Sequence, residues 1–144
     1  MERQSIDGTR ADRDHLLGLI RKRLLVVDEN LEDLRYYSAV LQHQGYEVHA
    51  IPSYKDGAAS VGSEDFDLIL LSQGSPSFEG RSVLSRAIER DRHASVVVLS
   101  RSIDMPCYIE AMQCGARDYM QKPWLPSEIG LLVRKYLGSA TASA

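Results

Sequence analysis

Residues 24–29 read Leu-Leu-Val-Val-Asp-Glu, four consecutive apolar side chains followed by two carboxylates. An unbroken apolar run of this length predicts a strand that is buried on both faces of a sheet. Two similar runs follow at residues 68–71 and 96–99, and each is followed by a serine, Ser72 or Ser100. Strands buried on both faces are typical of parallel sheets, so these three runs indicate the centre of an α/β fold.

Segments with helical periodicity separate the apolar runs. They contain Leu34–Leu41, Tyr54–Val61, Val83–Ile88, Asp104–Met112 and Pro126–Tyr136. Residues 46–51 alternate in polarity and predict a half-covered edge strand, and residues 118–120 predict a short fifth strand. Strands that alternate with helices predict a doubly wound, five-stranded parallel sheet with helices on both faces.

The chain of 144 residues fits one domain with two flanking segments. Residues 1–22 are interpreted as a partly disordered extension with a short helix, in which Leu16, Leu17, Leu19 and Ile20 form an apolar patch. Residues 23–138 form the predicted domain. Residues 139–144 are small and polar, and they predict a disordered tail.

Composition excludes several classes of function. The formal net charge is −3, and the one basic run, residues 21–23, is typical of a solvated helix end, so we expect no direct nucleic-acid partner. Without an apolar stretch of membrane-spanning length or a secretory signal, the sequence predicts a cytoplasmic protein with no membrane partner. Cys107 and Cys114 lie about 10 Å apart along a helix, which is too far for a disulfide.

Polar side chains follow the predicted strands at their carboxyl ends. In strand order they are Asp28 and Glu29, then Ser72, then Ser100 and Arg101, and finally Lys122. Because the carboxyl ends of parallel strands meet at one edge of the sheet, we expect these residues to share a crevice. Carboxylates bind magnesium, while lysine and hydroxyl groups bind phosphate oxygens. The set therefore indicates a pocket for a phosphoryl group and a hard cation.

These motifs, in this order, resemble the response regulator receiver family over about residues 23–137. The matching stretches are Leu25–Asn30, Phe66–Leu71, Val98–Ser100 and Gly115–Trp124, with Pro76, Glu79, Gly80 and Asp104 at the family's loop and helix-start positions. The resemblance implies a flavodoxin-like fold with strand order 2-1-3-4-5. It also implies a role in phosphorelay (two-component) signal transduction rather than enzyme activity.

The resemblance assigns roles to the pocket residues. Asp28 and Glu29 match the acidic pair that binds magnesium, and Ser100 and Lys122 match the residues that contact the phosphoryl group. Tyr119 matches the aromatic switch residue that turns inward on activation. Each residue also has a structural interpretation: a solvated acidic rim for the acidic pair, and ordinary packing for Tyr119.

The proline after Lys122 also has a structural interpretation. Pro123 matches a family proline that is preceded by a cis peptide bond, so the Lys122-Pro123 pair could equally serve the shape of a turn.

Ser72 stands where the family has its phosphoacceptor aspartate, four residues before Pro76, and the pair Glu79-Gly80 fixes that register. Asp67 lies five residues earlier, roughly 16 Å away along a strand. A serine hydroxyl is a weak nucleophile unless an adjacent base activates it. We therefore expect an atypical pseudo-receiver that is not phosphorylated on aspartate. The alternative is phosphotransfer to a non-standard acceptor such as Ser72.

Two further expectations concern charge in the pocket. Loss of one carboxylate predicts a weakened or lost magnesium site at Asp28 and Glu29. Arg101 stands where the family usually has a small residue, and it could pair with Asp28 or Glu29. The hypothesis is that Arg101 or Lys122 replaces the charge of the missing metal. The alternative for Arg101 is an exposed surface side chain.

The family's output face corresponds to residues 104–137, which comprise the fourth helix, the fifth strand and the fifth helix of the predicted domain. Tyr108, Arg117 and Trp124 are its expected exposed anchors. A histidine kinase, an output protein or a second copy of the chain are the expected partners. Nucleotide or flavin binding is a third hypothesis that the fold allows, but the sequence lacks a glycine-rich phosphate loop for it.

Overall fold

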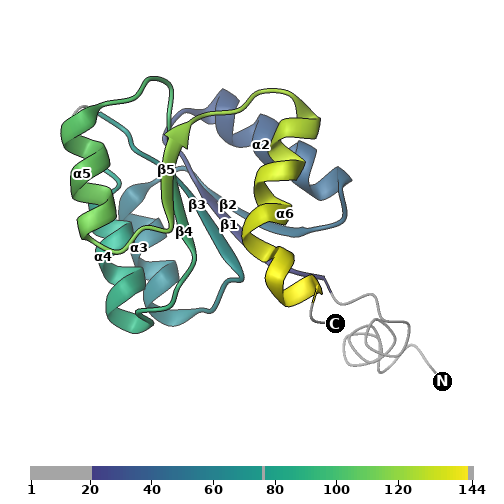
Figure 1. Ribbon diagram of the computed structural model, residues 1–144, viewed down its shortest axis with the longest axis horizontal. Coiled ribbons are helices and arrows are strands. Elements are labelled where there is room, and N and C mark those ends of the chain that lie inside the picture. The colour runs from purple at the N-terminus through teal and green to yellow at the C-terminus, as the bar shows by residue number, and fades with distance from the viewer. Residues whose placement is uncertain (1–20, 76, 143–144) are drawn as a thin grey trace.

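Five parallel strands form one sheet in the order β2-β1-β3-β4-β5 in the computed structural model, which describes residues 21–75 and 77–142 (Figure 1). The strands are β1 (Arg23–Val27), β2 (Glu47–Ile51), β3 (Leu68–Ser72), β4 (Val96–Ser100) and β5 (Asp118–Gln121). Both the parallel α/β architecture and the strand order agree with the sequence-based prediction. The order places β1 and β3 side by side at the centre, where the chain reverses its direction of winding.

Helices cover both faces of this sheet (Figure 1). Helices α2 (Leu31–His43) and α6 (Pro126–Ala142) pack on one face. Helices α3 (Tyr54–Ser63), α4 (Arg81–Arg90) and α5 (Met105–Gln113) pack on the other. Within the described residues these helices leave the carboxyl edge of the sheet open, and a pocket lies there.

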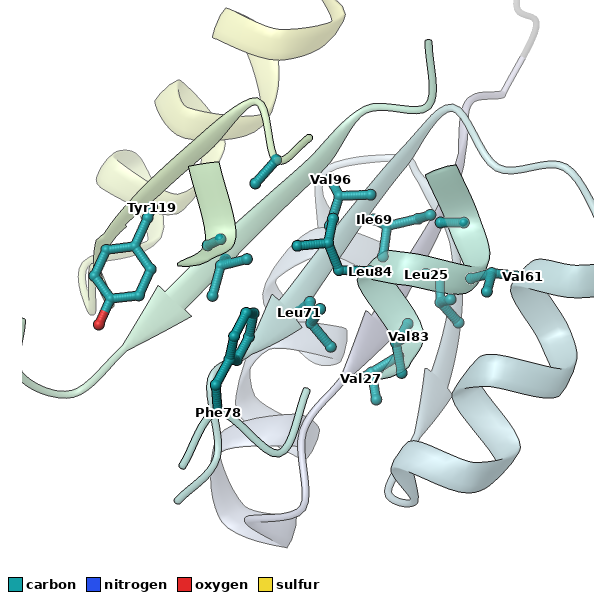
Figure 2. Packing of buried hydrophobic residues seen from close by; sticks show 14 of the residues in the cluster. Leu25, Val27, Val61, Ile69, Leu71, Phe78, Val83, Leu84, Val96 and Tyr119 are labelled. Carbon is teal, nitrogen blue, oxygen red and sulfur yellow. The ribbon is translucent and has the colours of Figure 1, made fainter. Parts of the chain in front are cut away.

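Alternate residues of each central strand supply two separate cores, because successive side chains of a strand point to opposite faces. Leu25, Leu71 and Val98 face α3, α4 and α5 (Figure 2 shows Leu25 and Leu71). Leu70 and Leu99 face α2 and α6. Every residue of β3 and β4 is buried, which explains the unbroken apolar runs from which these strands were predicted.

Side-chain caps fix where three helices begin. The Asn30, Ser53 and Asp104 side chains accept hydrogen bonds from backbone N–H groups in the first turns of α2, α3 and α5. Asp104 was expected at such a position. Loss of a cap of this kind typically costs about 1 kcal/mol of helix stability. The caps set the positions at which the helices leave the carboxyl edge of the sheet.

Several details differ from the sequence-based expectations or lie outside the described residues. Helix α6 continues to Ala142, past the predicted domain end at Gly138. Within the described residues there is no cis peptide bond, so the Lys122–Pro123 bond is trans, and the expectation of a cis bond is wrong. The predicted N-terminal helix around Leu16–Ile20 lies outside the described residues.

Two observations bear on the expectations drawn from composition. Neither Cys107 nor Cys114 takes part in a disulfide, as their spacing predicted. In the described part of the chain, no helix combines the length and the apolar character needed to cross a membrane.

Candidate functional site

A polar pocket of about 250 Å³ opens at the carboxyl ends of β1, β3 and β4. Its lining contains every residue that the sequence placed there: Asp28, Glu29, Ser72, Ser100, Arg101 and Lys122. Residues as far apart in the chain as Asp28 and Lys122 therefore share one cavity, because parallel strands bring their carboxyl ends together. Asn30, Gln73 and Asp104 also line the pocket and were not part of the predicted set.

Lys122 is the central cation of the pocket, and its side chain is only 4% exposed. Its Nζ donates hydrogen bonds to Asp28 Oδ2 at 2.7 Å and to Asp33 Oδ2 at 2.8 Å. Burial raises the pKa of Asp28, while the hydrogen bond from Lys122 acts in the opposite direction. The Lys122 ammonium at 2.7 Å favours the ionised form of the Asp28 carboxyl. Lys122 thus forms ion pairs with two buried carboxylates, those of Asp28 and Asp33.

Asp33 is a site residue that sequence reasoning missed, and it contacts two cations. Its side chain is 7% exposed, and Arg101 Nη2 lies 2.8 Å from both of its carboxylate oxygens. The prediction that Arg101 pairs with Asp28 or Glu29 is wrong, because its partner is Asp33. A signal for Asp33 existed, since it shares the apolar face of α2 with Tyr37 and Leu41 at four-residue spacing. A carboxylate on a buried face needs a cation.

Arg101 itself lies at the rim of the pocket. Its side chain is 59% exposed, yet its guanidinium lies 5.4 Å from the centre of the Trp124 ring. The Trp124 ring also contacts Tyr36 and Tyr37. Arg101 therefore combines an ion pair with a cation–π contact, an arrangement that suits a planar guanidinium. The side chain is exposed, as the alternative predicted, but it is held by Asp33 and Trp124 and does not pair with Asp28 or Glu29.

Glu29 is held by a tyrosine from the start of α3. Tyr54 Oη donates to Glu29 Oε1 at 2.5 Å and lies 3.2 Å from the carbonyl oxygen of Ser72. Burial, followed by this contact with Glu29, raises the pKa of Tyr54, so the phenol stays protonated and remains a donor. Tyr54 was expected only as the first residue of a weak helix.

Ser72 ends β3 inside the pocket and is buried. Across the described residues no side-chain base hydrogen-bonds its hydroxyl. The following turn is tight: a Cβ on Gly80 would lie 2.6 Å from the Ser72 carbonyl oxygen, which explains the glycine after Glu79. The Ser100 hydroxyl donates to the carbonyl oxygen of Ser102. Neither serine hydroxyl is hydrogen-bonded to a side-chain base among the residues that the structure describes, so neither is activated as a nucleophile.

The pocket residues do not fit a magnesium site. Asp28 Oδ2 accepts from Lys122 and Oδ1 accepts from the backbone N–H of Asn30, while Glu29 accepts from Tyr54. No group of three histidine, cysteine or acidic side chains within the described ranges is placed to hold a metal ion. Magnesium requires near-octahedral oxygen ligands, usually with one or two carboxylates free to bind it.

Tyr119 of β5 points into the core rather than toward solvent. Its ring belongs to the same buried cluster as Phe78 and Leu71 (Figure 2), and it packs edge-on against Tyr108 with ring centres 5.7 Å apart. Its hydroxyl donates to Gln73 Oε1 and accepts from the backbone N–H of Asp104. The inward position is therefore fixed by polar contacts as well as by packing.

Comparison with known proteins agrees with this geometry. The sequence profile of the response regulator receiver domain matches residues 24–134, and the chain belongs to that family. It is 26% identical to the transcriptional regulatory protein PcoR of Escherichia coli over 85% of this chain and 54% of PcoR. It is 29% identical to the DNA-binding response regulator MtrA of Mycobacterium tuberculosis, over 84% of this chain and 53% of MtrA. The chain thus spans about half the length of the curated relatives it matches.

Solved receiver domains share the fold. A CheY-like receiver domain protein from Methanospirillum hungatei superimposes with a TM-score of 0.77 at 23% identity, covering 87% of this chain and all of that one. The BeF3-activated receiver domain of DrrB superimposes with a TM-score of 0.71 at 24% identity, covering 83% of this chain and 99% of that one. The fold of these solved structures therefore agrees with the receiver domain family that the sequence profile shows.

Proposed function

We propose that this receiver domain signals through protein contacts and is not phosphorylated on aspartate. The observation that carries the proposal is the position of Ser72. The strand end that lies in the pocket beside Lys122 holds a hydroxyl instead of a carboxylate. A carboxylate is a nucleophile at neutral pH, whereas a serine hydroxyl requires a base.

The surrounding charges support the same proposal. Lys122 donates to Asp28 and Asp33, and Arg101 bonds Asp33 as well, so four charged groups balance one another without a phosphoryl group or a metal. An incoming phosphoryl group would have to draw Lys122 away from two buried carboxylates. Removing one partner from a buried ion pair is strongly destabilising. The pocket is thus suited to a permanent internal network.

The partner surface belongs to the α5-β5-α6 side of the domain. On α5, Met105, Tyr108, Ile109 and Met112 are all exposed and recur at helical spacing. They form an apolar row on a helix whose opposite side, at Cys107, is buried. Rows of this kind mark sites of protein contact. A histidine kinase, an output protein or a second copy of the chain is the class of partner we propose.

Intact mass measurement tests the absence of phosphorylation. The protein is incubated with acetyl phosphate and Mg²⁺, and we expect no gain of a phosphate, since no carboxylate acceptor stands at the end of β3. A gain that disappears in Ser72→Ala but persists in Ser77→Ala would instead establish Ser72 as the acceptor. Ser77 is an exposed serine of the same loop and serves as the matched control.

A further inference from the structure

Gln73 follows Ser72 directly and takes no part in the charge network of the pocket. It is 5% exposed, although a glutamine side chain usually lies in solvent. Its Oε1 accepts a hydrogen bond from the Tyr119 hydroxyl, and its Nε2 donates to the carbonyl oxygen of Ser75. A buried amide with both ends bonded is a structural link between the end of β3 and β5.

The same tyrosine hydroxyl continues the link to α5. It accepts a hydrogen bond of 3.0 Å from the backbone N–H of Asp104. The Asp104 side chain in turn caps α5, accepting from the N–H of Cys107 at 3.0 Å. Three consecutive hydrogen bonds therefore run from the strand end that carries Ser72 to the first turn of the helix that carries the exposed apolar row.

Because these hydrogen bonds are buried or partly buried, breaking one of them alone is costly. If the Tyr119 side chain left the core, the side-chain amide oxygen of Gln73 and the backbone N–H of Asp104 would lose their shared partner. Leaving a buried polar group without a partner costs more free energy than the hydrogen bond itself contributes. The edge-on contact between Tyr119 and Tyr108 would also be lost. Packing and polar contacts thus favour the same inward position.

Apart from Gln73 and Asp104, no pocket residue in the described part of the chain hydrogen-bonds to the Tyr119 hydroxyl. The Ser100 hydroxyl bonds to Ser102, and Lys122 bonds to Asp28 and Asp33. The link between the carboxyl edge of the sheet and α5 consequently runs through Gln73 and not through the residues that resemble a phosphoryl site.

We propose that Gln73 is a built-in latch, which holds Tyr119 in the core and fixes the start of α5 without any phosphoryl group. The latch goes beyond the proposed function, because it would hold α5 whether or not Ser72 can be modified. It makes the position of the apolar row on α5 a constant property of the fold.

Methionine methyl NMR on the full chain tests the latch without a phosphoryl donor. Of four methionines, Met105 and Met112 lie on α5, Met120 lies on β5, and Met1 lies far from them in sequence. We expect Gln73→Leu to shift, broaden or double the Met105 signal. The amide exchange of Asp104 should rise by about fivefold or more, the factor expected for loss of one hydrogen bond. The matched control is Gln42→Leu, an exposed glutamine on α2.

Tyr119→Phe removes the hydroxyl and keeps the ring, so it tests the same link with little change of volume. It should reproduce the effects on Met105 and Asp104, and adding Gln73→Leu to it should change them little further. The latch is refuted if either single variant leaves Met105 and Asp104 as in the wild type, or if the two effects simply add. Because no phosphate is present, this result is independent of the mass measurement.

Discussion

Asp33 is a buried carboxylate shared by the Lys122 ammonium and the Arg101 guanidinium, and the two cations depend on it unequally. The Lys122 side chain is almost fully buried, whereas that of Arg101 is mostly in solvent and rests on Trp124. A buried charge that loses its partner cannot recover hydration, while an exposed one can. Asp33 is therefore more important for Lys122 than for Arg101.

Substitution at this network should show that inequality. We expect Asp33→Asn to lower the free energy of unfolding by roughly 2–4 kcal/mol, because Lys122 keeps only Asp28 as an ionised partner. Arg101→Gln should cost less than about 1 kcal/mol, because that pair is exposed on the Arg101 side. Urea unfolding followed by Trp124 fluorescence measures both. An equal loss of unfolding free energy in the two variants would show that the burial of Lys122 does not make its ion pair with Asp33 more important than that of Arg101.

At the scale of whole elements, apolar runs and periodicity were sufficient to predict a five-stranded parallel sheet, while its strand order was implied by the resemblance to the receiver family. The buried strands β3 and β4 were found because burial on both faces requires uninterrupted apolar residues. The end of α6 was missed because residues from Gly138 onward are small and polar, so their composition favours fraying. Local patterns predict an element well where the core dictates its residues and less well at its ends.

The pocket was predicted as a set of strand ends, but its contacts were not. The motif positions gave Asp28, Ser72 and Lys122 correctly as neighbours. Asp33 and Gln73 were missed because their partners lie far away in the sequence, directly after β4, on β5 and directly after β5. No local pattern reveals which cation a helix carboxylate will meet, since that depends on how the sheet brings distant segments together.

The edge strand β2 carries a pH-dependent contact of its own. Glu47 accepts hydrogen bonds from His49 and from Arg23 of the neighbouring β1, and these lower the pKa of Glu47, with the contact to His49 the largest cause. A carboxyl with a lowered folded-state pKa stabilises the fold above its ordinary pKa. That contribution is lost as the pH falls through the lowered value.

Acid titration of stability tests this contact. We expect Glu47→Gln to flatten part of the decline in melting temperature below about pH 4.5, with an effect at neutral pH within about 1 kcal/mol because the pair is partly exposed. Glu32→Gln, an exposed carboxylate in the first turn of α2, is the matched control. An unchanged acid profile in Glu47→Gln would mean that the Glu47 contact adds no pH dependence.

Across the whole molecule, the pocket and the apolar row on α5 stand at two ends of one polar link. A ligand moves a distant element only by as much as its affinity differs between that element's two positions. If Gln73 holds Tyr119 and the start of α5 in one position, binding in the pocket has no second position to favour. The pocket and the row should then be energetically independent in the wild-type domain.

A carboxylate introduced at position 72 makes it possible to measure whether the pocket and the apolar row on α5 are independent. Ser72→Asp supplies the third acidic ligand, so we expect it to bind Mg²⁺ at least about tenfold more tightly than the wild type, detected through the pocket amides. Ser102→Asp, which adds the same charge at the exposed rim, should not.

The methyl signals of Met105 and Met112 should stay in place when Mg²⁺ binds to Ser72→Asp, and they should move when it binds to the double variant Ser72→Asp/Gln73→Leu. Movement of Met105 in Ser72→Asp alone would show that the pocket still controls α5 while Gln73 is intact, and that the latch does not isolate the two. If Mg²⁺ does not bind to Ser72→Asp, the metal site is lost because Lys122 occupies the Asp28 carboxylate and not because residue 72 is a serine.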